Sequence, residues 1–223
     1  MKKNIILAGI ISLIMFFIAC TETEETTALD DLGKELLKKE MPAEMKPCVV
    51  TLDHESVVVN WTSFKLSDKV GVGGTFDSVV VTGVSDNETM AGAAETAQFD
   101  IYTASVNSNN PVRDVKISDS FFGTMTNAAT ISGKVISLNE DGSGAVALTM
   151  NGVEKEIGVQ WEATSESRLK LSATLNVPDW DAQSSLDSLN GVCSVLHTGK
   201  DGTSVLWPDV EIEVFADFKS DCE

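Results

Sequence analysis

Few residues of this chain have the type and spacing that catalysis or metal binding requires. The only histidines are His54 and His197, and neither lies in a Cys/His cluster or completes a serine nucleophile motif. A glycine-rich stretch, residues 71–74, falls between two predicted strands, so it lacks the helix N-terminus that phosphate-binding loops use. The sequence therefore predicts no catalytic residues, no cofactor and no metal site, and a protein that is not an enzyme.

One cysteine has a context typical of covalent lipidation. Lys2 and Lys3 precede an apolar run over residues 5–19, which is shorter than the about 20 apolar residues of a membrane-spanning helix and fits a secretory signal. The run ends in a segment, residues 17–20, that resembles the lipobox of bacterial lipoproteins. We therefore expect a signal peptide over residues 1–19 and acylation of Cys20. Thr21, where an Asp would favour inner-membrane retention, favours an outer-membrane lipoprotein that faces the periplasm or the cell surface.

Composition limits the remaining classes of protein. The formal net charge of −18 repels nucleic acid, whose binding depends on neutralising phosphates, so no nucleic-acid partner is expected. The length fits one domain after a tether. Residues 20–47 are predicted to be the acylated N-terminus, a Thr/Glu-rich tether and a short helix, which Pro42 and Pro47 end. The domain is expected over residues 48–223, and its oligomeric state stays open.

Beyond Cys48 the apolar residues recur with period 2, which indicates strands with one buried face. About eight strands are expected, over residues 56–66, 72–82, 96–106, 130–138, 144–150, 153–163, 168–177 and 210–218. Asn151-Gly152 favours a two-residue type I′ turn, which pairs Met150 with Val153 and Val146 with Ile157. Residues 180–192 are predicted to form a short helix with Asp179 or Asp181 as N-cap. The pattern by itself allows either a closed barrel or a sandwich.

Three segments resemble the YceI-like family, in the same order and at matching spacing. They are residues 61–76, ending in Gly-Thr-Phe; residues 103–122, which contain Arg113-Asp114 and end in Phe121-Phe122; and the hairpin of residues 148–156. The resemblance covers roughly residues 49–219. It implies an all-β fold, an eight-stranded antiparallel lipocalin-like barrel with one or two short helices, around an apolar channel for polyprenyl or fatty-acyl chains.

The resemblance makes the interior of the barrel the expected ligand site. The residues expected along the apolar channel are Trp61, Phe64, Phe76, Ile117, Phe121, Phe122, Met125, Leu148, Met150 and Trp161. Arg113 has two interpretations: its guanidinium could hold a polar or phosphate head at the channel mouth, or it could fix the loop with Asp114. The structural interpretation of Arg113 is preferred.

Topology predicts one disulfide. In a closed antiparallel barrel the first and last strands pair, which brings Cys48, before the first strand, near Cys222, after the last. Cys193 lies in an apolar context and is expected to be a buried free thiol.

Two functions of different classes follow from these patterns. The first is a lipoprotein that binds an apolar lipid or isoprenoid ligand, as carrier or scavenger, and reaches the membrane through acylated Cys20. The second is a structural or adhesive surface module whose core is filled by its own side chains. A continuous channel in the structure would count against the second.

Overall fold

The computed structural model describes residues 48–221, which belong to one compact unit, Pro47–Glu223. The predicted signal peptide (1–19), Cys20, the tether and helix of residues 20–47, and Cys222 lie outside the described residues. Within residues 48–221, no helix is long and apolar enough to cross a membrane.

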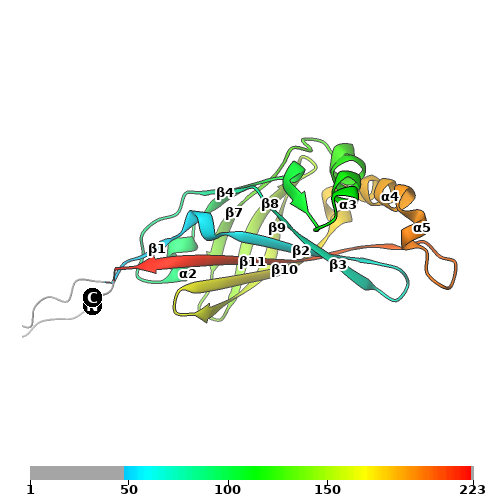
Figure 1. Cartoon of the computed structure of the whole chain (residues 1–223). Coiled ribbons are helices and arrows are strands. Elements are labelled where there is room, and N and C mark those ends of the chain that lie inside the picture. Colours follow the sequence, from blue (N-terminus) through cyan, green and yellow to red (C-terminus); the bar gives the residue numbers. More distant parts are fainter. Residues whose placement is uncertain (1–47, 222–223) are drawn as a thin grey trace, which may run out of the picture. The chain divides into compact units, whose positions relative to one another are not determined.

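The described residues form an antiparallel sheet that curls around its own apolar face (Figure 1). Its strands are β1 (Val50–Leu52), β2 (Val58–Lys65), β3 (Val70–Phe76), β4 (Val79–Thr82), β5 (Gln98–Tyr102), β6 (Val106–Asn107), β7 (Thr130–Leu138), β8 (Ser143–Met150), β9 (Val153–Ser165), β10 (Arg168–Asn176) and β11 (Leu206–Ser220). Apart from β1, which pairs with β11, they follow the order β4-β5-β7-β8-β9-β10-β11-β2-β3-β6.

The expectation of a closed barrel of eight strands is wrong: the sheet has eleven strands and is a half-barrel. Two predicted strands are each broken by a bend. Asp77 and Ser78 separate β3 from β4, and a 3₁₀ turn, η2 (Thr103–Ser105), separates β5 from β6. β1 is an additional short strand. Among the described residues, no ladder joins the two end strands β4 and β6, so the sheet does not close completely.

The hairpin predicted at Asn151-Gly152 is confirmed in register. Met150 pairs with Val153 and Val146 with Ile157. Asn151 and Gly152 have φ values of 52° and 73°, the left-handed region that a type I′ turn requires at both positions. The local sequence therefore specifies which face of β8 and β9 turns toward the core.

The last strand also pairs with the beginning of the domain, as predicted. β11 is hydrogen-bonded to β10 on one side and to β2 on the other, and β1 pairs with its final residues. Val50 pairs with Ser220, and Val49 N donates to Asp221 Oδ1 at 2.8 Å. The two ends of the described domain therefore lie side by side.

Short helices gather at the other end of the sheet (Figure 1). They are α3 (Pro111–Lys116), the π-helical turn η3 (Ile117–Phe121), η4 (Phe122–Thr124), η5 (Val177–Trp180), α4 (Gln183–Val192) and α5 (Ser194–His197); α2 (Met90–Ala94) and η1 (His54–Ser56) lie elsewhere. This is more helix than the one or two predicted, because residues 107–127 are largely helical.

The caps of two helices differ. Asn110 caps α3, since its Oδ1 accepts from Arg113 N at 3.2 Å and Pro111 occupies the first turn. The helix predicted over residues 180–192 is α4, but neither Asp179 nor Asp181 caps it. Its N-cap position is Ala182, because Asp181 adopts a left-handed conformation that ends η5.

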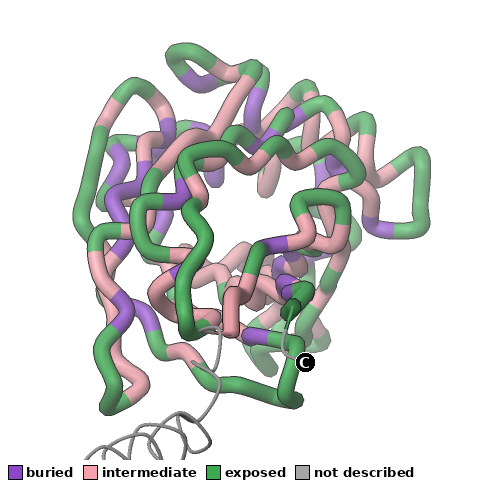
Figure 2. Tube along the Cα trace, turned by 90° about the vertical axis from the view of Figure 1, so that its left-hand side faces the viewer, coloured by how far each residue is buried: buried purple, intermediate pink, exposed green. Residues whose placement is uncertain are grey.

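The buried side chains form two clusters, one toward each end of the sheet. The first contains Trp61, Phe122, Met150 and Trp180 and lies beneath the helical end. The second contains Leu52, Val159 and Phe218 and lies toward the chain ends, under α2. Figure 2, which looks along the curled sheet, shows the chain curling round with buried, half-buried and exposed segments alternating along it.

Candidate functional site

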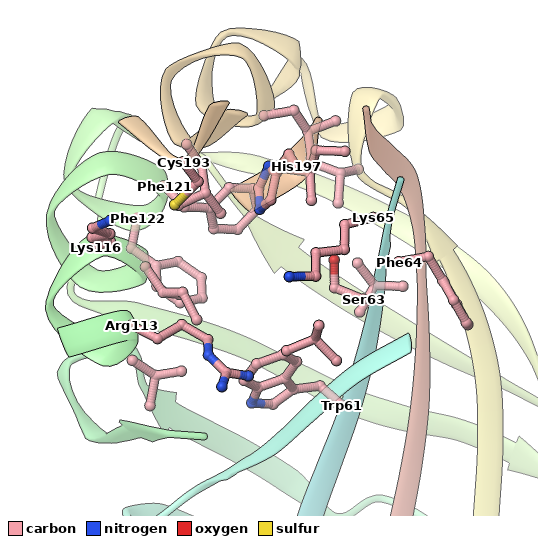
Figure 3. Close-up of a pocket in the computed structure, with 18 of the residues that line it drawn as sticks. Trp61, Ser63, Phe64, Lys65, Arg113, Lys116, Phe121, Phe122, Cys193 and His197 are labelled. Carbon is pink, nitrogen blue, oxygen red and sulfur yellow. The ribbon is translucent and has the colours of Figure 1, made fainter. Parts of the chain in front are cut away.

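A cavity of about 550 Å³ lies between the concave face of the sheet and the helical end. Most of its lining is apolar, as Figure 3 shows in close-up. Its lining residues are Trp61, Ser63, Phe64, Lys65, Val72, Phe76, Val106, Asn110, Val112, Arg113, Lys116, Ile117, Phe121, Phe122, Ile131, Met150, Leu175, Val177, Leu186, Leu189, Cys193, Leu196, His197, Leu206, Val210 and Ile212.

The sheet contributes to the cavity through strand alternation. Trp61 and Ser63 of β2 lie opposite Ile212 and Val210 of β11, and cross-strand partners share a face. Lys65, two residues further along β2, pairs with Leu206 on the same face. The register of these two strands therefore carries apolar residues into the cavity, followed by a cation at its helical end.

Trp61 is positioned by its neighbours on β3. Its Nε1 donates to Thr75 O at 3.2 Å, and its indole lies against Gly74. A Cβ atom at Gly74 would lie 2.5 Å from the indole and 2.4 Å from Asn107 O, closer than real Cβ contacts. Only glycine therefore allows this tryptophan to pack flat against β3.

Aromatic rings from the helical turns pack against the wall of the cavity. The rings of Phe121 and Phe122 meet edge to face with centroids 5.0 Å apart, and the Phe122 ring lies 6.1 Å from that of Phe76. Phe122 is buried, whereas Phe76 and Phe121 are half-buried. This cluster joins η3 and η4 to β3 and forms a rigid apolar surface.

Seven of the ten predicted apolar residues line the cavity: Trp61, Phe64, Phe76, Ile117, Phe121, Phe122 and Met150. Phe64 borders it, but its ring points away in Figure 3 and lies 4.9 Å from the Lys69 ammonium. Met125 and Leu148 are buried in the surrounding cluster without lining the cavity. Trp161 packs on the second cluster and donates to Asn139 O. Ligand contact by any of them stays a prediction.

Sequence reasoning missed one wall of the cavity and most of its charge. The wall is formed by Leu186 and Leu189 of α4, by Cys193 between the two helices, and by Leu196 and His197 of α5. The spacing of three and four residues between Leu186, Leu189 and Cys193, along α4 and its C-cap, is the signal that identifies this wall. Lys65, Lys116 and His197 also line the cavity beside the predicted Arg113.

His197 is a buried component of this wall. Its Nδ1 lies 2.9 Å from Asn190 Oδ1, and because that oxygen only accepts, Nδ1 carries the proton. Burial lowers the pKa of His197, and the charges of Lys65 and Lys116 lower it further. Within the described residues, no group of three or more His, Cys, Asp or Glu side chains is placed to hold a metal ion.

The two cysteines among the described residues, Cys48 and Cys193, are in different chemical states. Cys48 is disulfide-bonded, whereas Cys193 is a buried free thiol, as predicted. Cys222 lies outside the described residues, so its pairing with Cys48 stays a prediction.

An antiparallel half-barrel with an internal, largely apolar cavity is the class of domain that the fold and site define. The chain belongs to the YceI-like domain family, whose model matches residues 49–218. No curated protein matches the chain.

Two solved structures share the fold. A polyisoprenoid binding domain from Saccharophagus degradans, implicated in plant cell wall breakdown, is 18% identical with a TM-score of 0.51, covering 77% of this chain and 98% of that one. BcnA from Burkholderia cenocepacia is 14% identical with a TM-score of 0.53, covering 75% of this chain and 99% of that one. At these identities the likeness concerns the fold.

Proposed function

We propose that this protein binds an apolar ligand, of polyprenyl or fatty-acyl type, in the cavity and acts as a carrier or scavenger rather than an enzyme. The observation that carries the proposal is the cavity itself. Its volume of about 550 Å³ lies within the range of small-molecule sites, roughly 300–1,000 Å³. The polyisoprenoid binding of the Saccharophagus relative supports this choice of ligand class.

The cavity also weighs against a structural module with a filled core. Protein interiors pack about as densely as organic crystals and leave few voids larger than a water molecule. An apolar void of this size leaves its lining without packing partners, which costs stability unless a ligand fills it. Phe121, Phe122 and Ile117 could have filled the space from the helical turns, but they line it instead.

Organic extraction of the purified protein tests the proposal. We expect mass spectrometry of the extract to identify a single-chain lipid or isoprenoid at near-stoichiometric amounts. The delipidated full chain should then bind N-phenyl-1-naphthylamine, a neutral apolar dye, with an increase in dye fluorescence. An empty extract together with no dye binding would reject the carrier function.

We further propose that the protein is an outer-membrane lipoprotein anchored through acylated Cys20. Several acyl chains give firm anchoring, at about 0.8 kcal/mol per buried methylene. The Cys20→Ser variant lacks the acylated thiol and is expected to leave the membrane fraction as soluble protein or uncleaved precursor. Detergent phase partitioning of the variant and the unaltered protein measures this. Equal partitioning of both would show that the lipoprotein assignment is wrong.

A further inference from the structure

The cavity is lined by cationic side chains that have no salt-bridge partner among the described residues. Four Lys or Arg side chains among residues 48–221 are half-buried: Lys65, Arg113, Lys116 and Lys170. Lys170 lies on the outside and pairs with Glu213 at 2.6 Å. The other three all line the cavity, and within the described residues none of them forms a salt bridge.

The cavity also lacks the carboxylates that are abundant elsewhere. The chain has 34 Asp and Glu residues against 16 Lys and Arg, yet none of the residues that line the cavity is acidic. Asp114, the nearest carboxylate in sequence to Arg113, accepts hydrogen bonds from both the backbone N and the Oγ of Ser108 instead. Asp114 therefore fixes the loop at Ser108, as the structural interpretation expects, but among the described residues no salt bridge joins Arg113 to Asp114.

Lys65 and Arg113 reach the cavity from opposite walls. Lys65 ends β2, and its Nζ donates one hydrogen bond, at 3.2 Å, to Leu196 O of α5. An ammonium group has three donors, so two remain. Arg113 extends from α3, and Figure 3 shows both side chains entering the same space, with the Ser63 hydroxyl beside Lys65. Lys116 follows Arg113 by about one turn of α3.

Two of these cations, on different elements, act on the same residue of the helical wall, His197. The positive charges of Lys65, from the sheet, and Lys116, from α3, both act on His197 and, after burial, lower its pKa. The cavity cations are half-buried and have no salt-bridge partner in the described part of the chain, and an oxyanion would supply acceptors for charge-assisted hydrogen bonds from them. The apolar surface of Trp61, Phe122 and Met150 lies in the same cavity.

We propose that the ligand is an amphiphile with an anionic head, either a carboxylate or a phosphate, held between Lys65 and Arg113 with its chain along the apolar lining. Guanidinium pairs with two oxygens of such a head, while Lys65 adds a point charge and Ser63 a hydroxyl donor. Lys116 adds positive potential. This inference rests on the proposed function, since it names the chemical class of the ligand for the same cavity.

Matched ligands that differ only in the head group test the inference. The delipidated full chain is loaded with the neutral dye at pH 8, and competitors are added below their micelle concentrations. Palmitate is compared with palmitamide, and geranylgeranyl phosphate with geranylgeraniol. At least one anion is expected to displace the dye about tenfold or more tightly than its neutral partner, the effect of one or two charge-assisted hydrogen bonds. Which anion does so identifies a fatty acid or an isoprenyl phosphate.

Two double variants show whether the cavity cations cause the preference. Lys65→Gln/Arg113→Gln is expected to reduce the anion preference, measured within the variant as the ratio of its affinities for the anionic and the neutral partner, to about twofold or less. The control Lys134→Gln/Lys200→Gln removes the same charge from two exposed positions and should keep the full preference. A circular dichroism spectrum and an unfolding temperature close to those of the unaltered protein show that each variant is folded, and Lys65→Arg/Arg113→Lys, which retains both charges, should keep most of the preference.

The outcomes separate this inference from the proposed function. Equal affinity for anionic and neutral partners, or a preference that survives in Lys65→Gln/Arg113→Gln, would overturn the anionic head while dye binding preserves the carrier function. Loss of dye binding in the unaltered protein would overturn both.

Discussion

The Trp180→Ala variant is expected to lose about 3–5 kcal/mol of unfolding free energy. Trp180 is only 1% exposed, and its Nε1 donates to Leu148 O at 3.0 Å, so it joins η5 to β8. Its truncation removes a large apolar surface and leaves a void beneath the helical end, next to a cavity that already lacks packing. For a domain of this size, thermal unfolding should shift by about 10 °C.

Two controls separate the causes of that loss. Trp180→Phe retains most of the ring but removes the donor to Leu148, so a smaller loss of about 1–2 kcal/mol is expected. Trp207→Ala makes the same truncation at a half-buried indole and should also cost less. Calorimetry of the three variants measures these differences, and equal losses for Trp180→Ala and Trp207→Ala would contradict the role given to Trp180.

Breaking the predicted Cys48–Cys222 disulfide is expected to have an effect of similar size. Val50 pairs with Ser220, and Val49 exchanges hydrogen bonds with Asp221. We expect the same antiparallel register to bring position 222 opposite position 48. A bridge there would close nearly the whole domain, a loop for which chain entropy allows roughly 5 kcal/mol, although measured values are often smaller. Cys222→Ser should therefore lower the unfolding temperature, as should reduction of the unaltered protein.

Sensitivity to reductant identifies the paired cysteines. Cys48→Ser and Cys222→Ser are expected to unfold at the same temperature with and without dithiothreitol. Cys193→Ala, which alters the free thiol, should remain sensitive. Non-reducing peptide mapping provides the direct measurement, and a link from Cys48 to Cys20, or persistent sensitivity in Cys222→Ser, would disprove the pairing.

The bend between β3 and β4 could not be predicted from the local sequence pattern. Residues 72–82 keep their strand-like character through Asp77 and Ser78, so the sequence predicts one strand there. The break depends on partners far along the chain: Asp77 N donates to Ser105 O, and Tyr102 N donates to Ser78 O. A bend held by such long-range hydrogen bonds has no local signature, so two of the eight predicted strands are each divided in two, and the additional strand β1 makes the total among the described residues eleven.

In the cavity, too, some residues could be predicted from local sequence patterns, whereas others are placed by contacts with distant parts of the chain. Trp61, Phe76 and Phe122 could be selected because a family motif and strand alternation mark them. Lys65 carries no such mark, because a lysine at the end of a strand is ordinarily exposed. It becomes a cavity residue only because α5 folds over the end of β2 and accepts its hydrogen bond.

The sequence by itself determined the all-β class, the register of the β8–β9 hairpin and the apolar face of the sheet, because turn chemistry and residue alternation act between near neighbours. Tertiary structure alone decided whether that apolar face surrounds packed side chains or a cavity, since both require the same pattern. The placement of α3, α4 and α5 over the end of the sheet settles this, and with it the convergence of Lys65 and Arg113 on one space.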